Sequence, residues 1–121
     1  MRTHKDLEVW KRGIDLVTKV YQITLDFPKE EVYGLTSQMR RAGVSVPANI
    51  AEGASRHSDK EFIQFLYIAL GSLTELDTHF IISHNLEYLN KETYHDLSKE
   101  AEEIGRMLSG LIKYVKRKSK N

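Results

Sequence analysis

SQMRRAGVSVPANIAEGASR, from Ser37 to Arg56, decides the fold, because it contains a proline and two glycines yet keeps a helical period. Loops do not keep a 3.6-residue period, whereas apolar positions recur here every three or four residues. We predict one helix that continues across Pro47 and bends there, because Pro47 removes a hydrogen bond and presses on the carbonyl of Gly43. The alternative is two short helices, the second capped by Ser45. The apolar positions are Leu35, Met39, Ala42, Val46, Ile50 and Gly53.

A polar stripe runs beside the apolar one, and its members are Gln38, Arg41, Ser45, Asn49, Glu52 and Arg56. Glu52 before Arg56 is the favourable order for an ion pair at this spacing. A neighbouring helix or subunit would cover such a stripe, so each buried polar group needs a partner. We predict that Arg40 or Arg41 pairs with an acidic residue of the third helix. The candidate partners are Glu75 and Asp77.

The polar stripe therefore fixes how helices or subunits meet. Two alternatives stay open, namely contact with a ligand or nucleic acid, and an active site. The stripe offers no nucleophile with an adjacent base, and Ser45 has no histidine at helical spacing.

Apolar periodicity on both sides of this stretch predicts further helices and no strand. Pro28 ends the first helix. Ser58 with Glu61 caps the third, and Asn90 caps the fourth. Short connections make consecutive helices antiparallel, so we expect an all-α, up-down-up-down four-helix bundle. The helices lie at about residues 6–26, 31–55, 59–84 and 91–117 of a single domain spanning residues 1–121.

The first and third helices carry more apolar surface than one bundle core hides. An exposed apolar band of that size makes a monomer poorly soluble, so we expect self-association. The alternative is that the third helix is the most buried helix of a monomer.

The totals describe an ordinary globular chain of 121 residues, with 40% hydrophobic and 29% charged residues. Eighteen Lys and Arg against 17 Asp and Glu give a net charge of +1, which is no nucleic-acid signature by itself. The absence of cysteine excludes disulfides and thiol catalysis and fits a reducing cytosol. The N-terminus has no apolar h-region, so we expect no secretory signal, and the longest uninterrupted apolar run, around Phe65 to Leu70, is far shorter than a membrane span. We therefore expect a cytoplasmic protein without a membrane partner.

Catalytic and metal-binding patterns are sparse. A bundle that holds two metal ions uses two Glu-x-x-His motifs, and this chain has one, from Glu92 to His95. His79 and His84 are five residues apart and point in different directions. No phosphate-binding glycine loop occurs. We therefore expect no cofactor, no metal and no enzymatic activity.

Basic residues form two groups. Lys5, Arg12 and Lys19 recur every seven residues on one helix face, and a second group lies at the C-terminus. Its members are Lys113, Lys116, Arg117, Lys118 and Lys120. One interpretation is solvated surface with cations at a helix C-terminus. The other is a track for a phosphate backbone, which a ring-shaped oligomer would repeat.

Several of these motifs together resemble the bacterial four-helix-bundle proteins encoded in intervening sequences of 23S ribosomal RNA genes. The resemblance covers nearly the whole chain, and the Asn-Ile-Ala-Glu-Gly element is its most specific part. A related branch is the accessory protein of diversity-generating retroelements. The matching segments are Asp6–Trp10, Phe27-Pro28, Tyr33–Gln38, Arg40–Ala42, Ser45–Gly53, Glu61-Phe62, Phe65-Leu66, Ala69–Glu75 and Glu103-Ile104.

The resemblance implies a homopentameric barrel of four-helix bundles and no catalysis. For the retroelement branch it also implies a basic surface that binds nucleic acid and a reverse transcriptase. Our first hypothesis is a non-enzymatic oligomer that contacts RNA or DNA through basic residues. A second is a structural or adaptor protein that binds another protein, such as a reverse transcriptase, without nucleic acid. The third is a metal or small-molecule enzyme.

Overall fold

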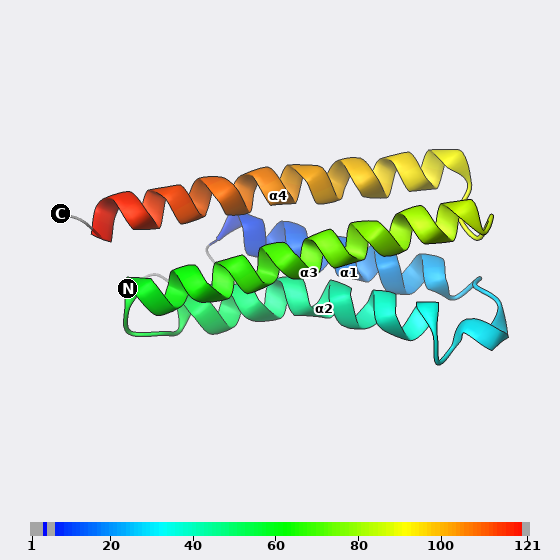
Figure 1. Cartoon of the computed structure of the whole chain (residues 1–121), viewed down its shortest axis with the longest axis horizontal. Helices are drawn as coiled ribbons and strands as arrows, with labels where there is room; N and C mark the ends of the chain where they lie inside the picture. Colours follow the sequence, from blue (N-terminus) through cyan, green and yellow to red (C-terminus); the bar gives the residue numbers. More distant parts are fainter. Residues whose placement is uncertain (1–3, 5–6, 120–121) are drawn as a thin grey trace.

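Four long α-helices make up most of the chain, and none of the described residues forms a strand. The structure is a computed structural model that describes residue 4 and residues 7–119. A short 3₁₀ helix, η2 (Lys29–Glu31), lies in the first connection. The expected all-α fold is confirmed. The helices are α1 (Glu8–Thr24), α2 (Leu35–Ala54), α3 (Asp59–Asn85) and α4 (Lys91–Ser119) (Figure 1).

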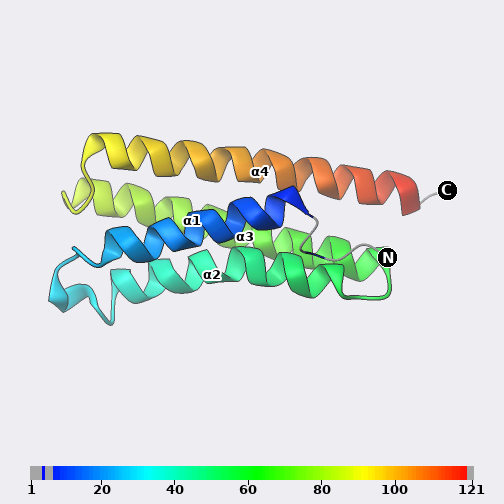
Figure 2. The ribbon, with the colours of Figure 1, turned by 180° about the vertical axis from the view of Figure 1, so that it is seen from behind.

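Consecutive helices run in opposite directions along one long axis (Figure 1). Each helix contacts the two beside it around the bundle, so α1 lies between α2 and α4 (Figure 2). The buried apolar side chains of all four helices form one continuous core. Helix α1 is shorter than α4, and the last turns of α4 extend past the start of α1 (Figures 1 and 2). That end of the bundle is therefore the less covered one.

Helix α2 passes Pro47 without interruption, which confirms one helix over two short ones. Pro47 is buried, and so are Val46 and Ile50 beside it. Gly13 of α1 lies opposite the proline ring, where an added Cβ would lie 3.5 Å from Pro47 Cβ. Packing against a small residue thus offsets part of the cost of the missing hydrogen bond. A bend of α2 at this position stays a prediction.

The start of α2 was predicted wrongly, at about residue 31 instead of Leu35. Glu31 belongs to the 3₁₀ turn, and its side chain accepts a hydrogen bond from the Leu35 backbone N–H at 3.1 Å. Its other oxygen accepts the Tyr88 hydroxyl at 3.0 Å, and this bond raises the pKa of Tyr88 above its ordinary value. Glu31 therefore caps α2 from outside the helix and ties that connection to the α3–α4 turn.

Local signals set the starts of α3 and α4 as predicted. The Ser58 hydroxyl accepts the Glu61 backbone N–H at 3.1 Å, and the Asn90 side chain accepts the Thr93 backbone N–H at 2.8 Å. Helix α3 ends at Asn85 and α4 at Ser119, each within two residues of its predicted end.

Helices α2 and α3 are in close contact at Gly53. A Cβ there would lie 2.7 Å from Phe65 Cβ, closer than real Cβ atoms come, and 3.0 Å from a ring carbon of Phe62. Glycine at this position lets the ends of the two helices meet before the short turn that joins them. The close approach determines how α2 and α3 are placed relative to each other.

Replacing Gly53 with Ala should lower the free energy of unfolding by about 1–3 kcal/mol, because the added methyl must push the two helices apart. Gly110→Ala is the matched control, since nothing lies within 4 Å of a Cβ there. That change should raise stability by up to about 1 kcal/mol through helix propensity. Chemical denaturation measures both. Equal effects of the two changes would contradict the close approach.

Candidate nucleic-acid interface

Two members of the predicted basic stripe of α1 form ion pairs with acidic residues of α4. Arg12 Nη2 lies 2.7 Å from Glu103 Oε1, and Lys19 Nζ lies 2.8 Å from Glu100 Oε1. The third member, Lys5, lies outside the described residues. Arg12 and Lys19 therefore join α1 to α4, and each has an acidic partner in the folded protein.

The pair between Arg12 and Glu103 perturbs the carboxylate. The hydrogen bond from the Arg12 guanidinium holds the pKa of Glu103 below its ordinary value, although desolvation acts in the opposite direction. The ionised form of Glu103 is therefore part of the folded structure.

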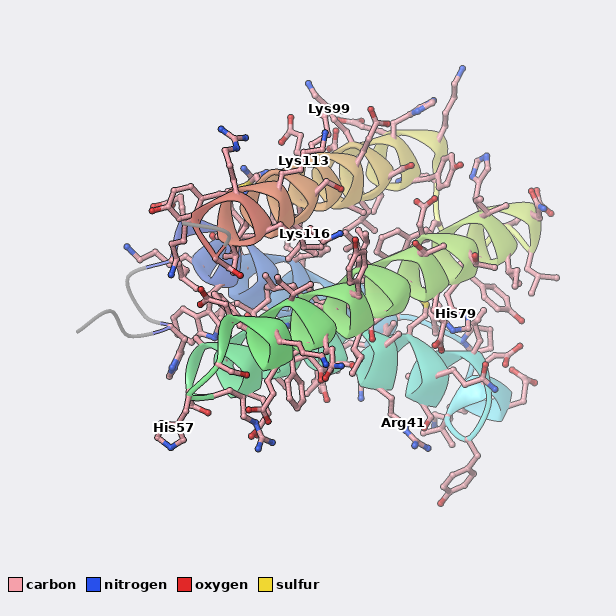
Figure 3. All side chains as sticks on the ribbon, turned by 60° about the vertical axis from the view of Figure 1, so that its left-hand side comes forward. Arg41, His57, His79, Lys99, Lys113 and Lys116 are labelled. Atoms are coloured by element: carbon pink, nitrogen blue, oxygen red, sulfur yellow. The ribbon has the colours of Figure 1, made fainter. Side chains whose placement is uncertain are left out.

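The C-terminal group is mostly free of acidic partners. Lys113 and Arg117 are exposed, and within the described part of the chain neither has a hydrogen bond or an ion pair. Lys116 Nζ donates to the Tyr67 hydroxyl of α3 at 2.8 Å. Figure 3 shows Lys113 on the outer side of α4 and Lys116 on the side that faces α3.

Lys118 differs from these three, because its Nζ lies 3.2 Å from Asp59 Oδ2. This ion pair joins the end of α4 to the start of α3. Lys120, the last cation of the predicted group, lies outside the described residues.

Charge is unevenly divided between the two ends of the bundle. The end made by residues 25–34 and 86–96 carries six acidic residues and two lysines. The opposite end, made by residues 52–61 and 110–119, carries six Lys and Arg and three acidic residues. We call these the acidic end and the basic end. A polyanion is attracted to one end of the molecule and repelled from the other.

Helix α4 also carries a basic spacing that the sequence analysis missed. Lys99, Arg106 and Lys113 recur every seven residues, as the α1 stripe does, so they share the outer face of α4. Figure 3 shows Lys99 and Lys113 on that face. Arg106 forms an ion pair with Glu102 at 2.6 Å, and an exposed pair of this kind contributes little to the stability of the fold. This seven-residue period is visible in the sequence and indicates a basic face on α4.

A hydrogen-bond network of three residues joins α2 to α3. The Asn49 side-chain amide donates to the Ser45 carbonyl at 2.8 Å and to Ser45 Oγ at 2.9 Å. Ser45 Oγ also lies 2.8 Å from Ser72 Oγ of α3. Ser45, which Asn49 of the same stripe holds in place, thus links the two helices close to Pro47.

The predicted pairing of Arg40 with an acid of α3 is wrong. Arg40 Nε donates to Thr24 Oγ1 at 2.9 Å, and the guanidinium lies 4.6 Å from the centre of the Tyr21 ring. The end of α1 offers a cation both carbonyl oxygens and an aromatic face, so Arg40 points there. Asp77, one proposed partner, accepts a hydrogen bond from Ser98 of α4.

Arg41 has no ion pair either in the described residues. It lines a surface depression of about 380 Å³ between α2 and α3, together with Gln38, Ser45 and Glu75. Glu75 Oε2 lies 3.2 Å from Nε2 of buried His79 instead. At the far end of the stripe, the predicted pair of Glu52 and Arg56 is confirmed at 2.9 Å.

A second groove of about 620 Å³ lies between α3 and α4. Leu73, Ala101 and Gly105 line it together with charges of both signs, such as Asp77 and Lys113. This mixed lining favours no single class of ligand. In residues 4 and 7–119, no three His, Asp or Glu side chains are grouped as metal ligands would be.

Helix α3 is long and apolar enough to cross a membrane by length and composition alone. Only 33% of its most apolar 18-residue window is buried inside the bundle, so a large part of that apolar surface faces outward. The exposed apolar side chains of α3 are Tyr67, Ile68, Ile81 and Ile82.

Comparison with known proteins relates this geometry to other chains. Residues 5–110 match the profile of a family described as 23S rRNA-intervening sequence protein. A solved structure from Bacteroides thetaiotaomicron, described as a protein with unknown function from the S23 ribosomal protein family, has the same fold with a TM-score of 0.80. It is 24% identical, and the alignment covers 87% of this chain and 95% of that one. A search of the curated proteins found no match.

Replacing Glu103 with Gln should destabilise the protein at neutral pH, and the difference from the wild type should shrink in acid. Because the folded pKa lies below the ordinary value of 4.5, the stabilisation is complete above about pH 4.5 and is lost as pH falls through the folded pKa. Denaturation at a series of pH values measures this. With Arg12→Met as background, the same substitution should have a smaller pH-dependent effect, because Lys99 and Arg106 are the lesser causes that remain. A difference that stays constant over the series would contradict the pairing.

Proposed function

The chain belongs to the 23S rRNA-intervening sequence protein family, and on that basis we propose that it is a non-enzymatic, cytoplasmic oligomer that binds RNA or DNA through its basic end. The observation that carries this proposal is the group Lys113, Lys116 and Arg117. These three cations lie on one exposed helix end and have no acidic partner in the described residues. Cations left unpaired beside an excess of positive charge are suited to phosphate contacts.

Self-association is the second part of the proposal. Ile68 and Ile82 of α3 are 50% and 41% exposed, and between them Gly71 would have nothing within 4 Å of an added Cβ. An exposed glycine inside a helix costs about 1 kcal/mol, which the close approach of another helix would offset. The Glu75 side chain lies on the same helix and is 59% exposed, so a lipid bilayer is a poor cover for this face. A second copy of the chain is a better cover, because it brings its own Arg41, which has no ion pair within the described residues.

The resemblance to homopentameric barrels sets the expected number of copies at five, and we propose that α2 bends at Pro47 within such an assembly. A closed ring of parallel copies brings their basic ends to one face. Several weak patches then act together on one nucleic acid, and the combined affinity exceeds that of any single patch.

Neutralising Lys113, Lys116 and Arg117 to Gln should weaken RNA binding roughly tenfold or more at about 50 mM salt and reduce the salt slope by about three, one unit for each cation. Fluorescence anisotropy over a salt series measures both quantities. The matched control is Lys29→Gln with Lys91→Gln at the acidic end, which should leave binding unchanged. If the wild type binds no RNA or DNA at low salt, the adaptor hypothesis replaces this proposal.

Replacing Ile68 and Ile82 with Arg should convert the oligomer to monomers of 14.0 kDa without loss of helix content, because the charges cannot be covered by a second copy. Light scattering after size exclusion measures the mass, and circular dichroism measures the helix content. Leu25→Arg is the control, since Leu25 is exposed and lies outside α3. An unchanged mass for the double variant would show that α3 is not the contact face.

A further inference from the structure

Two exposed tyrosines flank the free cations of the basic end. Tyr67 of α3 is 48% exposed and Tyr114 of α4 is 54% exposed. Neither residue belongs to the buried core cluster, and the Tyr67 hydroxyl accepts a hydrogen bond from Lys116. The Lys116 ammonium also lies 5.1 Å from the centre of the Tyr67 ring. A cation and an aromatic surface are thus held together at one edge of the site.

The order of these side chains around α4 is set by the helix. Each residue advances about 100° around the axis. Lys116 faces α3 and Tyr67, Lys113 lies further outward and lines the α3–α4 groove, and Arg117 and Tyr114 follow in the same direction. An aromatic ring, three cations and a second aromatic ring therefore follow one another across the end of the helix.

From this order we infer that the basic end takes single-stranded RNA or DNA in preference to a duplex. Bases of a duplex are stacked on one another, so a protein surface of this kind reaches only phosphates. A single strand presents both phosphates and unstacked bases, and tyrosine faces stack on bases of any sequence. The cations would hold the backbone, while Tyr67 and Tyr114 would each hold a base on either side. This inference rests on the proposed function and names the class of nucleic acid that the basic end binds.

The test compares a labelled single-stranded oligouridine with a duplex of equal length, at one salt concentration and with anisotropy as readout. The wild type should bind the single strand more tightly, by roughly tenfold. Tyr67→Leu with Tyr114→Leu should weaken single-strand binding at least about fivefold per ring and leave duplex binding unchanged. Tyr67→Phe with Tyr114→Phe should retain single-strand binding, because the ring faces remain. Thermal denaturation confirms that each variant is folded.

The outcomes distinguish failure of this inference alone from failure of the proposed function. If the wild type binds duplex as tightly as single strand, or if the Leu variant keeps its single-strand affinity, the tyrosines do not make the protein select single strands. In that case, loss of binding on neutralising Lys113, Lys116 and Arg117 still supports the proposed function. If the wild type binds neither nucleic acid at low salt, both fail together.

Discussion

The close approach of α2 and α3 at Gly53 is the constraint on which the rest of the structure depends. There is no room for a Cβ between the glycine and Phe65, so the two helices meet at a fixed distance. That contact lies just before the turn to α3, and it brings residues 52–61 beside the end of α4. The hydrogen-bond network of Ser45, Asn49 and Ser72 continues the same contact toward Pro47. The basic end exists because these segments, distant in sequence, are held together there.

The fold also decides which cations are available. Arg12 and Lys19 are placed against acids of α4, and Arg40 is placed against the end of α1. Lys118 is paired with Asp59. Lys113, Lys116 and Arg117 at the end of α4 have no acidic partner in the described residues, and α4 extends there past the start of α1. Of the predicted basic residues that the structure describes, these three are the ones without an acidic partner.

Much of the fold follows from the sequence because the signals are local. Apolar periodicity locates the helices, and the caps at Ser58 and Asn90 act within three residues. The start of α2 does not follow, because Glu31 caps it through a turn that also depends on Tyr88 of another connection. The partner of Arg40 does not follow either, since periodicity gives the face of a helix but not which neighbour attracts a long side chain. Part of the site follows from the sequence, namely the cations near the C-terminus. Tyr67 does not, because it lies beside Lys116 only when α3 packs against α4.

Ultraviolet cross-linking locates where nucleic acid contacts this protein, which we propose is the basic end. A single-stranded RNA is irradiated with the wild-type protein, and the cross-linked peptides are identified by mass spectrometry. Cross-links should fall in residues 56–67 and 106–119, with Tyr67 and Tyr114 among the modified side chains. Cross-links concentrated in residues 25–34 or 86–96, or spread evenly over the four helices, would contradict it.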